Sequence, residues 1–397
     1  MKILVLNCGS STLKFQLIET TEGGAERKLA RGIVDRIGGP GSYRFDANGD
    51  HLEATQVSIT SHDQAVKLVI DWLNSKAELR AIDAVGHRVV HGGDRFTHAA
   101  LINDEVIGDL EELCEIAPLH NPGAVSGIRA AQKILGSAMP MVAAFDTSFH
   151  HQIPEHAAQY AIPFELSQKH KIRRYGFHGL AHQYDIARYA QLVGQPLDRI
   201  SAVTLHLGNG CSATAIRNGR SVDTSMGFTP LEGLVMGTRS GDLDPALVTY
   251  LARKENVEAE VIENWLNQRS GLLGLSGLSN DMRELTAAYG TNPRARLAVD
   301  AFTYRARKYL GAYLAVLDGT GETVIFSGGI GENSPLVRKR ILTGMEWCSL
   351  YLDDAVNETI IGRDGFISAH HSKVAACVIH TDEEAIIARE TAMIVGG

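Results

Sequence analysis

Two kinds of hydrophobic spacing alternate along the chain. Residues 3–7 form a short apolar run, and residues 12–19 place Leu13, Phe15 and Leu17 on one face and polar residues on the other. The first pattern is typical of a buried strand and the second of a half-buried one, and the glycine-containing turn between them predicts a hairpin. The same criteria predict strands at 83–90, 141–145 and 323–327, and helices at 62–75, 122–135, 294–317, 335–345 and 382–395. Strands that alternate with helices predict an α/β fold.

The opening pattern returns near residue 201. Residues 201–216 again combine a strand, a glycine turn and an alternating strand, and Asn218-Gly219 then predicts a second hairpin. Two similar hairpins far apart in the chain indicate a duplicated core rather than one large sheet. Two helix starts are predicted from capping residues, with Asn121 as the N-cap before Pro122 and Thr381 as the N-cap of the last helix. Because no low-complexity linker is present, we place the domain boundary near residue 150.

Composition narrows the class of protein. The chain has 397 residues, 38 Lys and Arg, 46 Asp and Glu, and a net charge of −8, which argues against nucleic-acid binding through broad basic patches. No apolar run approaches the roughly 20 residues of a membrane span, and the N-terminal run is too short for a secretory signal, so we expect a cytoplasmic protein. The five Cys include no CxxC pair, which fits a reducing compartment and argues against a Cys-based zinc site.

Two glycine turns are candidate phosphate cradles. The segment from Asn7 to Lys14 offers hydroxyl groups, backbone N–H groups and a lysine on the next strand, and residues 207–212 form a similar turn. Each turn alone is better explained as an ordinary polar turn, but two at equivalent places in a repeated pattern favour a polyphosphate held between two domains. Neither is a P-loop, because GxxxxGK[ST] occurs nowhere in the chain.

Three candidate cations stand in glycine-rich or strand contexts. Arg88 and Val90 share a face of a predicted strand and suit a small carboxylate acid, although a surface ion pair would also explain the arginine. His178 and Arg239 each stand among glycines, where strong donors can stabilise charge on a transferring phosphoryl group. A local salt bridge is the alternative for Arg239. We interpret His87 and His91, which share the other strand face, as structural histidines.

Acidic and glycine-rich segments complete the candidate chemistry. Asp146 ends a strand where α/β sheets place ligands, although it could also cap the turn that follows. The acidic residues 382–384 begin the last helix, where they complement the helix dipole, and carboxylates together with the amide of Asn7 would also suit Mg²⁺. Residues 327–333 follow a buried strand and precede a helix, an arrangement that lets a ribose or flat ring approach the backbone.

In combination these segments resemble the acetate kinase family. The motifs are LNCGSSTLKF at 6–15, HRVVHGG at 87–93, PLHNP at 118–122, FDTSFH at 145–150, YGFHG at 175–179, HLGNGCS at 206–212, MGTRSGDLDP at 236–245, FSGGIGEN at 326–333 and TDEE at 381–384. They follow one another in the family's order, from residue 3 to about residue 390. The resemblance implies an actin-like, sugar-kinase-like fold with two domains of duplicated topology and a central cleft. It also implies reversible Mg²⁺-dependent phosphoryl transfer from ATP to acetate, in a homodimer.

The resemblance also implies domain roles. Residues 1–150 with the final helix 384–397 would form an N-terminal domain on the acyl and phosphate side, and residues 151–383 a nucleotide-binding domain. It implies catalytic roles for Asp146, His178 and Arg239. It implies a carboxylate grip by Arg88, with His120 nearby and an apolar wall made of Val90, Leu119, Phe177 and Pro230. Phosphate contacts are implied for Ser10, Thr12 and Lys14, and metal binding, to Mg²⁺ or to Mn²⁺ in its place, for Asn7 and Glu383. Nucleotide contacts are implied for His206, Leu207, Gly208, Asn209, Gly210, Asp281, Met282, Arg283, Gly329, Ile330, Gly331, Glu332 and Asn333.

One residue departs from the family pattern, and three other functions stay open. The family usually has Asn where Asp382 stands, so an extra negative charge lies beside the implied metal carboxylate Glu383. We hypothesise direct in-line transfer, with Asp146 as an orienting group rather than a phosphorylated intermediate. A propionate or butyrate kinase, an actin-like scaffold that uses ATP as a switch, and a phosphohydrolase are the alternatives.

Overall fold

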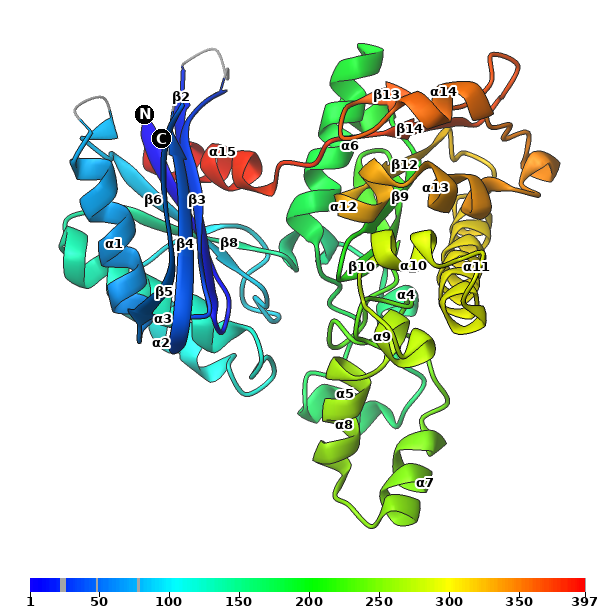
Figure 1. Ribbon diagram of the computed structural model, residues 1–397, viewed down its shortest axis with the longest axis horizontal. Helices are drawn as coiled ribbons and strands as arrows, with labels where there is room; N and C mark the ends of the chain where they lie inside the picture. The colour runs from blue at the N-terminus through cyan, green and yellow to red at the C-terminus, as the bar shows by residue number, and fades with distance from the viewer. Residues whose placement is uncertain (22–25, 48, 77–78, 397) are drawn as a thin grey trace. The chain divides into compact units, whose positions relative to one another are not determined.

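The computed structural model of the protein, drawn in Figure 1, describes residues 1–21, 26–47, 49–76 and 79–396. The chain divides into two compact units. Unit 1 comprises Met1–His151 together with Asp382–Gly397, and unit 2 comprises Gln152–Thr381. These limits lie near the predicted ones, and the assignment of acyl and nucleotide roles to the two units stays a prediction. None of the helices in the described ranges has both the length and the hydrophobicity to span a membrane.

Unit 1 is built on an eight-stranded mixed sheet with the strand order β5-β4-β3-β2-β1-β6-β8-β7. Strands β1 to β5 form an antiparallel meander, and β1, β6 and β8 run parallel. The strands are β1 Lys2–Cys8, β2 Thr12–Thr20, β3 Glu26–Asp35, β4 Gly39–Ala47, β5 Asp50–Ile59, β6 Ala84–Val89, β7 Ala100–Leu101 and β8 Met141–Phe145. The helices are α1 His62–Asn74, α2 Asp104–Glu112, α3 Asn121–Leu135 and α15 Glu383–Gly396, with a 3₁₀ turn at Ser148–His150.

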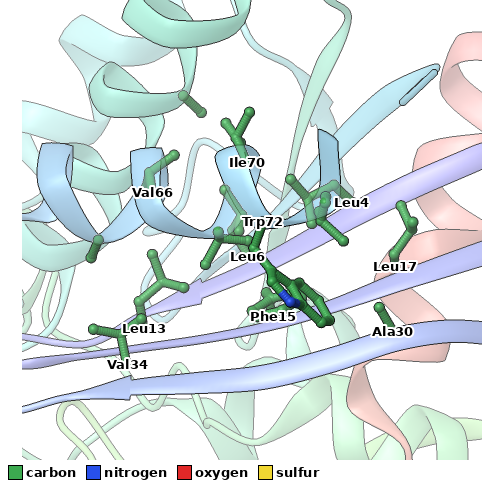
Figure 2. Close-up of a cluster of buried hydrophobic side chains, with 14 of the residues drawn as sticks. Leu4, Leu6, Leu13, Phe15, Leu17, Ala30, Val34, Val66, Ile70 and Trp72 are labelled. Atoms are coloured by element: carbon green, nitrogen blue, oxygen red, sulfur yellow. The ribbon is translucent and has the colours of Figure 1, made fainter. Parts of the chain in front are cut away.

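The apolar face predicted for residues 12–19 forms the core of unit 1. Leu13, Phe15 and Leu17 are almost fully buried and point toward α1, as Figure 2 shows. Phe45 and Trp72 complete an aromatic cluster, in which the ring centroids of Phe15 and Phe45 lie 5.1 Å apart and those of Phe45 and Trp72 lie 5.2 Å apart. Such burial removes about 150–250 Å² per aromatic ring from water, so this cluster anchors α1 on the meander.

Unit 2 contains a six-stranded sheet with the order β11-β10-β9-β12-β14-β13. Its strands are β9 Ala202–Leu207, β10 Cys211–Arg217, β11 Arg220–Thr224, β12 Thr323–Ser327, β13 Gly365–Phe366 and β14 Ala375–Val378. Its helices are α4 Glu155–Ala158, α5 Phe164–Lys169, α6 Gly179–Val193, α7 Ala246–Glu255, α8 Ala259–Gln268, α9 Gly271–Ser276, α10 Met282–Ala287, α11 Pro293–Val316, α12 Gly328–Asn333, α13 Pro335–Leu342 and α14 Asp354–Thr359. Short 3₁₀ turns cover Leu197–Arg199 and Glu346–Cys348.

The two sheets share one topology, which confirms the predicted duplication. The order β3-β2-β1-β6-β8 in unit 1 matches β11-β10-β9-β12-β14 in unit 2, with an antiparallel meander followed by two parallel strands in each case. The turn at Asn218 and Gly219 has the positive φ angles, 52° and 74°, that a type I′ hairpin requires. The expected α/β actin-like architecture of two related domains is therefore confirmed.

Three local predictions are wrong. Asn121 is the first residue of α3 rather than its cap, because its buried side chain forms two hydrogen bonds with the backbone of His91, at 3.1 and 2.9 Å. Thr381 does not cap α15, because its hydroxyl donates to Asp185 at 2.6 Å and Asp382 accepts from the backbone N–H of Ala385 instead. Residues 328–333 follow β12 and precede α13 as predicted, but they form the short helix α12 rather than a strand-to-helix turn.

Candidate functional site

In unit 1 the candidate chemistry gathers where parallel strands end. Arg88 is the second-last residue of β6, and Asp146 directly follows the neighbouring parallel strand β8. Helix α15 packs across both strands, and Gly86 permits this approach because a Cβ atom there would lie only 2.6 Å from Oγ1 of Thr391. Residues 86 and 88 share a face of the strand, so α15 brings its first residue, Glu383, to Arg88.

Arg88 is held by two carboxylates. Its Nε and Nη2 donate to the two oxygens of Asp146 at 2.9 and 2.7 Å, and its Nη1 lies 3.3 Å from a carboxylate oxygen of Glu383. Asp146 is 1% exposed, and the Arg88 side chain is 16% exposed. Burial opposes the charge on Arg88, but the negative charges of Asp146 and Glu383 outweigh it and raise the pKa of Arg88. Arg88 is therefore a fixed cation, and Asp146 pairs with it rather than serving only as a cap for the turn that follows.

This pairing restricts how a substrate carboxylate could meet Arg88. The guanidinium edge that carries Nε and Nη2 is occupied by Asp146, and the edge with Nη1 and Nη2 carries the remaining donor hydrogens. An incoming carboxylate would therefore use that second edge and compete there with Glu383. The family resemblance gave the carboxylate grip but not this preorganisation.

The predicted metal residues lie in the same region of unit 1. Asn7 is half-buried near the end of β1, opposite Lys14 in the strand register, and Glu383 begins α15, which packs on β1 and β2. Among the described residues no group of three His, Cys, Asp or Glu side chains is arranged to hold a metal. Mg²⁺ usually keeps several waters and needs only one or two carboxylates, so these oxygen donors fit that ion. Burial, and then the charge of Glu383, raise the pKa of the neighbouring Glu384.

The first glycine turn is fixed from two sides. The backbone N–H of Gly9 donates to the carbonyl of Thr12 at 2.8 Å, and the carbonyl of Gly9 accepts from Nε2 of His62, also at 2.8 Å. From the other side, α3 presents Gly123, whose Cβ, if it had one, would lie 2.6 Å from the Gly9 carbonyl. The predicted phosphate contacts line this hairpin, with exposed Ser10, half-buried Thr12 and exposed Lys14. His62, which the sequence did not single out, thus holds the turn.

The predicted apolar wall is divided between the two units. In unit 1, Val90 and His120 are half-buried, and Leu119 is 52% exposed in the turn before α3. In unit 2, Phe177 is buried, and Pro230 is half-buried with its carbonyl accepting from Nη1 of Arg239 at 3.2 Å. In unit 2, Pro230 therefore contacts the predicted cation Arg239, and Phe177 directly precedes His178.

In unit 2 two predicted cationic or donor groups converge over a glycine. A Cβ atom at Gly210 would lie 3.2 Å from Nε2 of His178 and 3.6 Å from Nη1 of Arg239, so glycine keeps the space between them open. Burial lowers the pKa of Arg239, and no carboxylate in the described part of the chain forms an ion pair with it. The predicted alternative, a local salt bridge at Arg239, is therefore absent there, and this cation is available to an anion.

A cavity of about 840 Å³ lies within unit 2, and its lining includes Gly208 and Asn209, which directly precede Gly210 in the chain. It is lined by eight of the predicted nucleotide residues, namely Gly208, Asn209, Asp281, Met282, Arg283, Gly329, Ile330 and Asn333. Asn280, Thr286 and Ser334 also line it and were not predicted from the sequence. Each of these three lies beside a predicted segment or one helical turn along it, which is the signal that could have identified them.

Five predicted nucleotide residues lie outside the lining of this cavity. Leu207 is fully buried, and Gly210 faces His178. Gly331 is buried within α12, and the carboxylate of Glu332 accepts from His380 at 2.6 Å and from the N–H of Thr381 at 3.2 Å. His206 bonds Ser327 through Nδ1 at 3.1 Å, and its ring centroid lies 4.9 Å from that of His178.

Comparison with known proteins gives one consistent result. A model of the acetokinase family matches residues 2–389. The chain is 48% identical to the acetate kinase of Chloroherpeton thalassium, with 98% of each chain covered, and 48% identical to that of Solibacter usitatus, with 100% of this chain and 99% of the relative covered. Its structure is similar to the acetate kinase of Porphyromonas gingivalis, with a TM-score of 0.91, 41% identity and 99% of each chain covered. It is equally similar to a propionate kinase from Francisella tularensis subsp. tularensis, with a TM-score of 0.91, 39% identity and 98% of each chain covered.

Proposed function

The chain belongs to the acetokinase family, and from this premise we propose that it transfers a phosphoryl group reversibly from ATP to acetate, giving ADP and acetyl phosphate. The observation that carries the proposal is the pairing of Arg88 with two carboxylates, which keeps a guanidinium charged and oriented at the C-terminal edge of the unit 1 sheet. A planar guanidinium with a remaining donor edge matches a small carboxylate acid.

The chemistry needs charge compensation more than proton transfer. Acetate is already ionised at neutral pH, so its oxygen can attack the γ-phosphorus without a general base. The bond from that phosphorus to the β,γ-bridging oxygen breaks, and the electron pair leaves with ADP. Because both reactants are anions, the protein has to position them and stabilise the charge on the transferring group.

The residues divide this work between the two units. We propose that Arg88 orients acetate and that Asp146 orients Arg88, so Asp146 is not phosphorylated. His178 and Arg239 would donate to the oxygens of the transferring group, and the cavity beside them would hold the nucleotide. Asn7 and Glu383 would hold Mg²⁺, which when bound supplies positive charge to the phosphate oxygens.

The test is acetate-dependent formation of acetyl phosphate, trapped as its hydroxamate, from ATP and Mg²⁺. We expect turnover that depends on acetate and releases no free phosphate in its absence. Phosphate release without an acid would instead indicate a phosphohydrolase, and ATP binding without turnover would indicate a switch-like scaffold.

A second candidate acceptor is propionate, because one similar structure is that of a propionate kinase. One methylene changes binding by only about 1–3 kcal/mol, so the two acids have to be compared directly. We expect kcat/KM to be highest for acetate, and a higher value for propionate or butyrate would reassign the substrate. We further propose that the protein is a cytoplasmic homodimer, and light scattering of the purified protein tests the dimer.

A further inference from the structure

His178 begins a buried row in which imidazole rings alternate with hydroxyl groups. Its Nδ1 lies 2.9 Å from Oγ of Ser212, and the same hydroxyl lies 2.8 Å from Nε2 of His182. Nδ1 of His182 lies in turn 2.7 Å from Oγ1 of Thr204. Ser212, His182 and Thr204 are all 0% exposed, so water does not compete for these hydrogen bonds.

The fold itself brings the four groups into line. His178 stands directly before α6, with a positive φ of 58°, and His182 follows it by one helical turn. In the β9–β10 hairpin, Ser212 pairs with His206 and Thr214 pairs with Thr204, so the side chains of Ser212 and Thr204 share the face of the sheet toward α6. The helix therefore supplies the rings, and the hairpin supplies the hydroxyls.

The direction of the row follows from the role of Thr204. Its hydroxyl either donates to Nδ1 of His182 at 2.7 Å, or accepts from that nitrogen and donates to the carbonyl of Thr214 at 3.5 Å. Because 3.5 Å is beyond the usual length of such a bond, we build on the first arrangement. When Thr204 donates to Nδ1, a neutral His182 carries its hydrogen on Nε2 and donates it to Ser212. A doubly protonated His182 would donate to Ser212 as well.

The hydroxyl of Ser212 then has His178 as its acceptor. Since it already accepts from His182, its own hydrogen points to Nδ1 of His178. A neutral His178 whose Nδ1 accepts must carry its hydrogen on Nε2. Nε2 is the atom that faces the open space over Gly210, on which Nη1 of Arg239 also converges.

We infer that Thr204, His182 and Ser212 are positioning residues that hold His178 in the Nε2–H tautomer, as a preorganised neutral donor for an anionic oxygen over Gly210. The inference rests on the proposed function only for the identity of that oxygen, which belongs to the transferring phosphoryl group. A donor fixed before the substrate binds needs no reorientation during the reaction, which is the property that makes such donors effective. None of the three residues touches the reacting atoms.

The tautomer can be measured in the ligand-free protein, independently of activity. Long-range ¹H–¹⁵N correlation spectra of protein labelled with ¹⁵N-histidine report which ring nitrogen of each of the 16 histidines carries the hydrogen. The variant His178→Gln identifies the signals of His178 by their loss. We expect the Nε2–H pattern for His178 in the wild-type protein, and the Nδ1–H pattern or a mixture in Ser212→Ala.

Steady-state kinetics supply the second readout. Removing one preorganised donor from an active site typically costs about 10²–10³-fold in kcat. Ser212→Ala leaves the ring in place with only part of the population in the correct tautomer, so we expect about a tenfold lower kcat. The KM values for ATP and acetate should stay unchanged. Thr204→Val, which is nearly isosteric, should shift the tautomer of His178 in the same direction. It replaces Ser212→Ala as the test if that variant does not fold.

Ser167→Ala is the matched control variant. Ser167→Ala removes another buried hydroxyl from unit 2, one that donates only to the carbonyl of Phe164, and should change neither tautomer nor kcat. An Nδ1–H or imidazolium signal for His178 in the wild-type protein overturns the inference, as does an unchanged signal in both Ser212→Ala and Thr204→Val. If the tautomer responds as expected but acetate is not phosphorylated, the proposed function is wrong, and the inference that Thr204, His182 and Ser212 fix the tautomer of His178 is still supported.

Discussion

Replacing Arg338 should weaken the binding of ATP without changing the binding of acetate. This arginine is fully buried, and no carboxylate in the described ranges pairs with it. Its guanidinium donates to the carbonyls of Gly331 and Glu332 at 2.8 and 3.0 Å, and to Asn357 and Ile360 at 2.7–2.8 Å. Burial lowers the pKa of Arg338 to about 10, with Glu358 opposing the shift. One side chain thus joins the C-terminal end of α12 to α14.

The loss of stability expected on replacing Arg338 follows from these hydrogen bonds. A hydrogen bond to a charged group contributes about 1.5–3 kcal/mol, and a buried acceptor left unsatisfied costs about 1–3 kcal/mol. Removing the buried charge offsets part of this loss, so we expect Arg338→Met to destabilise unit 2 by about 3–5 kcal/mol. At about 2–4 °C per kcal/mol for a domain of this size, the melting temperature should fall by roughly 10 °C.

The activity should change selectively. Gly329, Ile330 and Asn333 of α12 line the cavity that we propose holds the nucleotide, so a displaced α12 should raise the KM for ATP about tenfold, which corresponds to about 1.4 kcal/mol. The KM for acetate should stay within twofold of the wild-type value. Lys339→Met, on the same helix but half-exposed and paired with Asp354, is the matched control. An equal rise in both KM values, or a large fall in melting temperature with normal ATP binding, would refute the reasoning.

The remaining predictions concern four other residues. Arg88→Ala should chiefly raise the KM for acetate, and Arg239→Ala should chiefly lower kcat, and reversed effects in steady-state kinetics would contradict the assigned roles. Asp382→Asn keeps the cap of α15 but loses the ion pair with half-exposed Lys28, so the free energy of unfolding should fall by less than about 1 kcal/mol. Asp382→Ala also removes the cap, and urea titrations should show a further loss of about 1 kcal/mol. Burial lowers the pKa of His87 to about 3, so the unfolded chain takes up a proton that the folded protein excludes, and stability falls as pH drops below about 6.5. In urea titrations between pH 6.5 and 4, the free energy of unfolding of His87→Leu should depend less steeply on pH than that of the wild-type protein. An unchanged pH dependence would contradict this role of His87.

Periodicity predicted the parts of the fold in which one local signal dominates. The alternation at residues 12–19 and the Asn218-Gly219 turn follow from side-chain burial and backbone conformation within a few residues, and both are present as predicted. Helix α12 was missed because its glycines have low helix propensity. Its C-terminal carbonyls are capped by Arg338, a residue on the next helix, so its stability depends on packing that no local pattern reveals.

The candidate site shows the same division. Arg88 and Asp146 could each be singled out from their strand contexts, but their pairing depends on the parallel register of β6 and β8, which lie 58 residues apart at this point. For the row of Ser212, His182 and Thr204 behind His178, the sequence offers one indication. His178 and His182 are four residues apart, the spacing that places two side chains on one side of a helix. The hydroxyls come from strands β10 and β9, and only the three-dimensional structure places Ser212 between the two rings and Thr204 beyond His182.

The two predicted arginines differ in how their charge is balanced, and this difference favours different tasks. Arg88 is neutralised by Asp146 and Glu383 before any ligand arrives, which fixes its orientation and leaves little unpaired charge. Arg239 is also half-buried, yet among the described residues its hydrogen-bond acceptors are a carbonyl and a thioether, and burial lowers its pKa. A buried cation without a carboxylate gains most from an incoming anion, and it gains more as negative charge accumulates. Orientation of the acid therefore suits Arg88, and stabilisation of charge that grows during transfer suits Arg239.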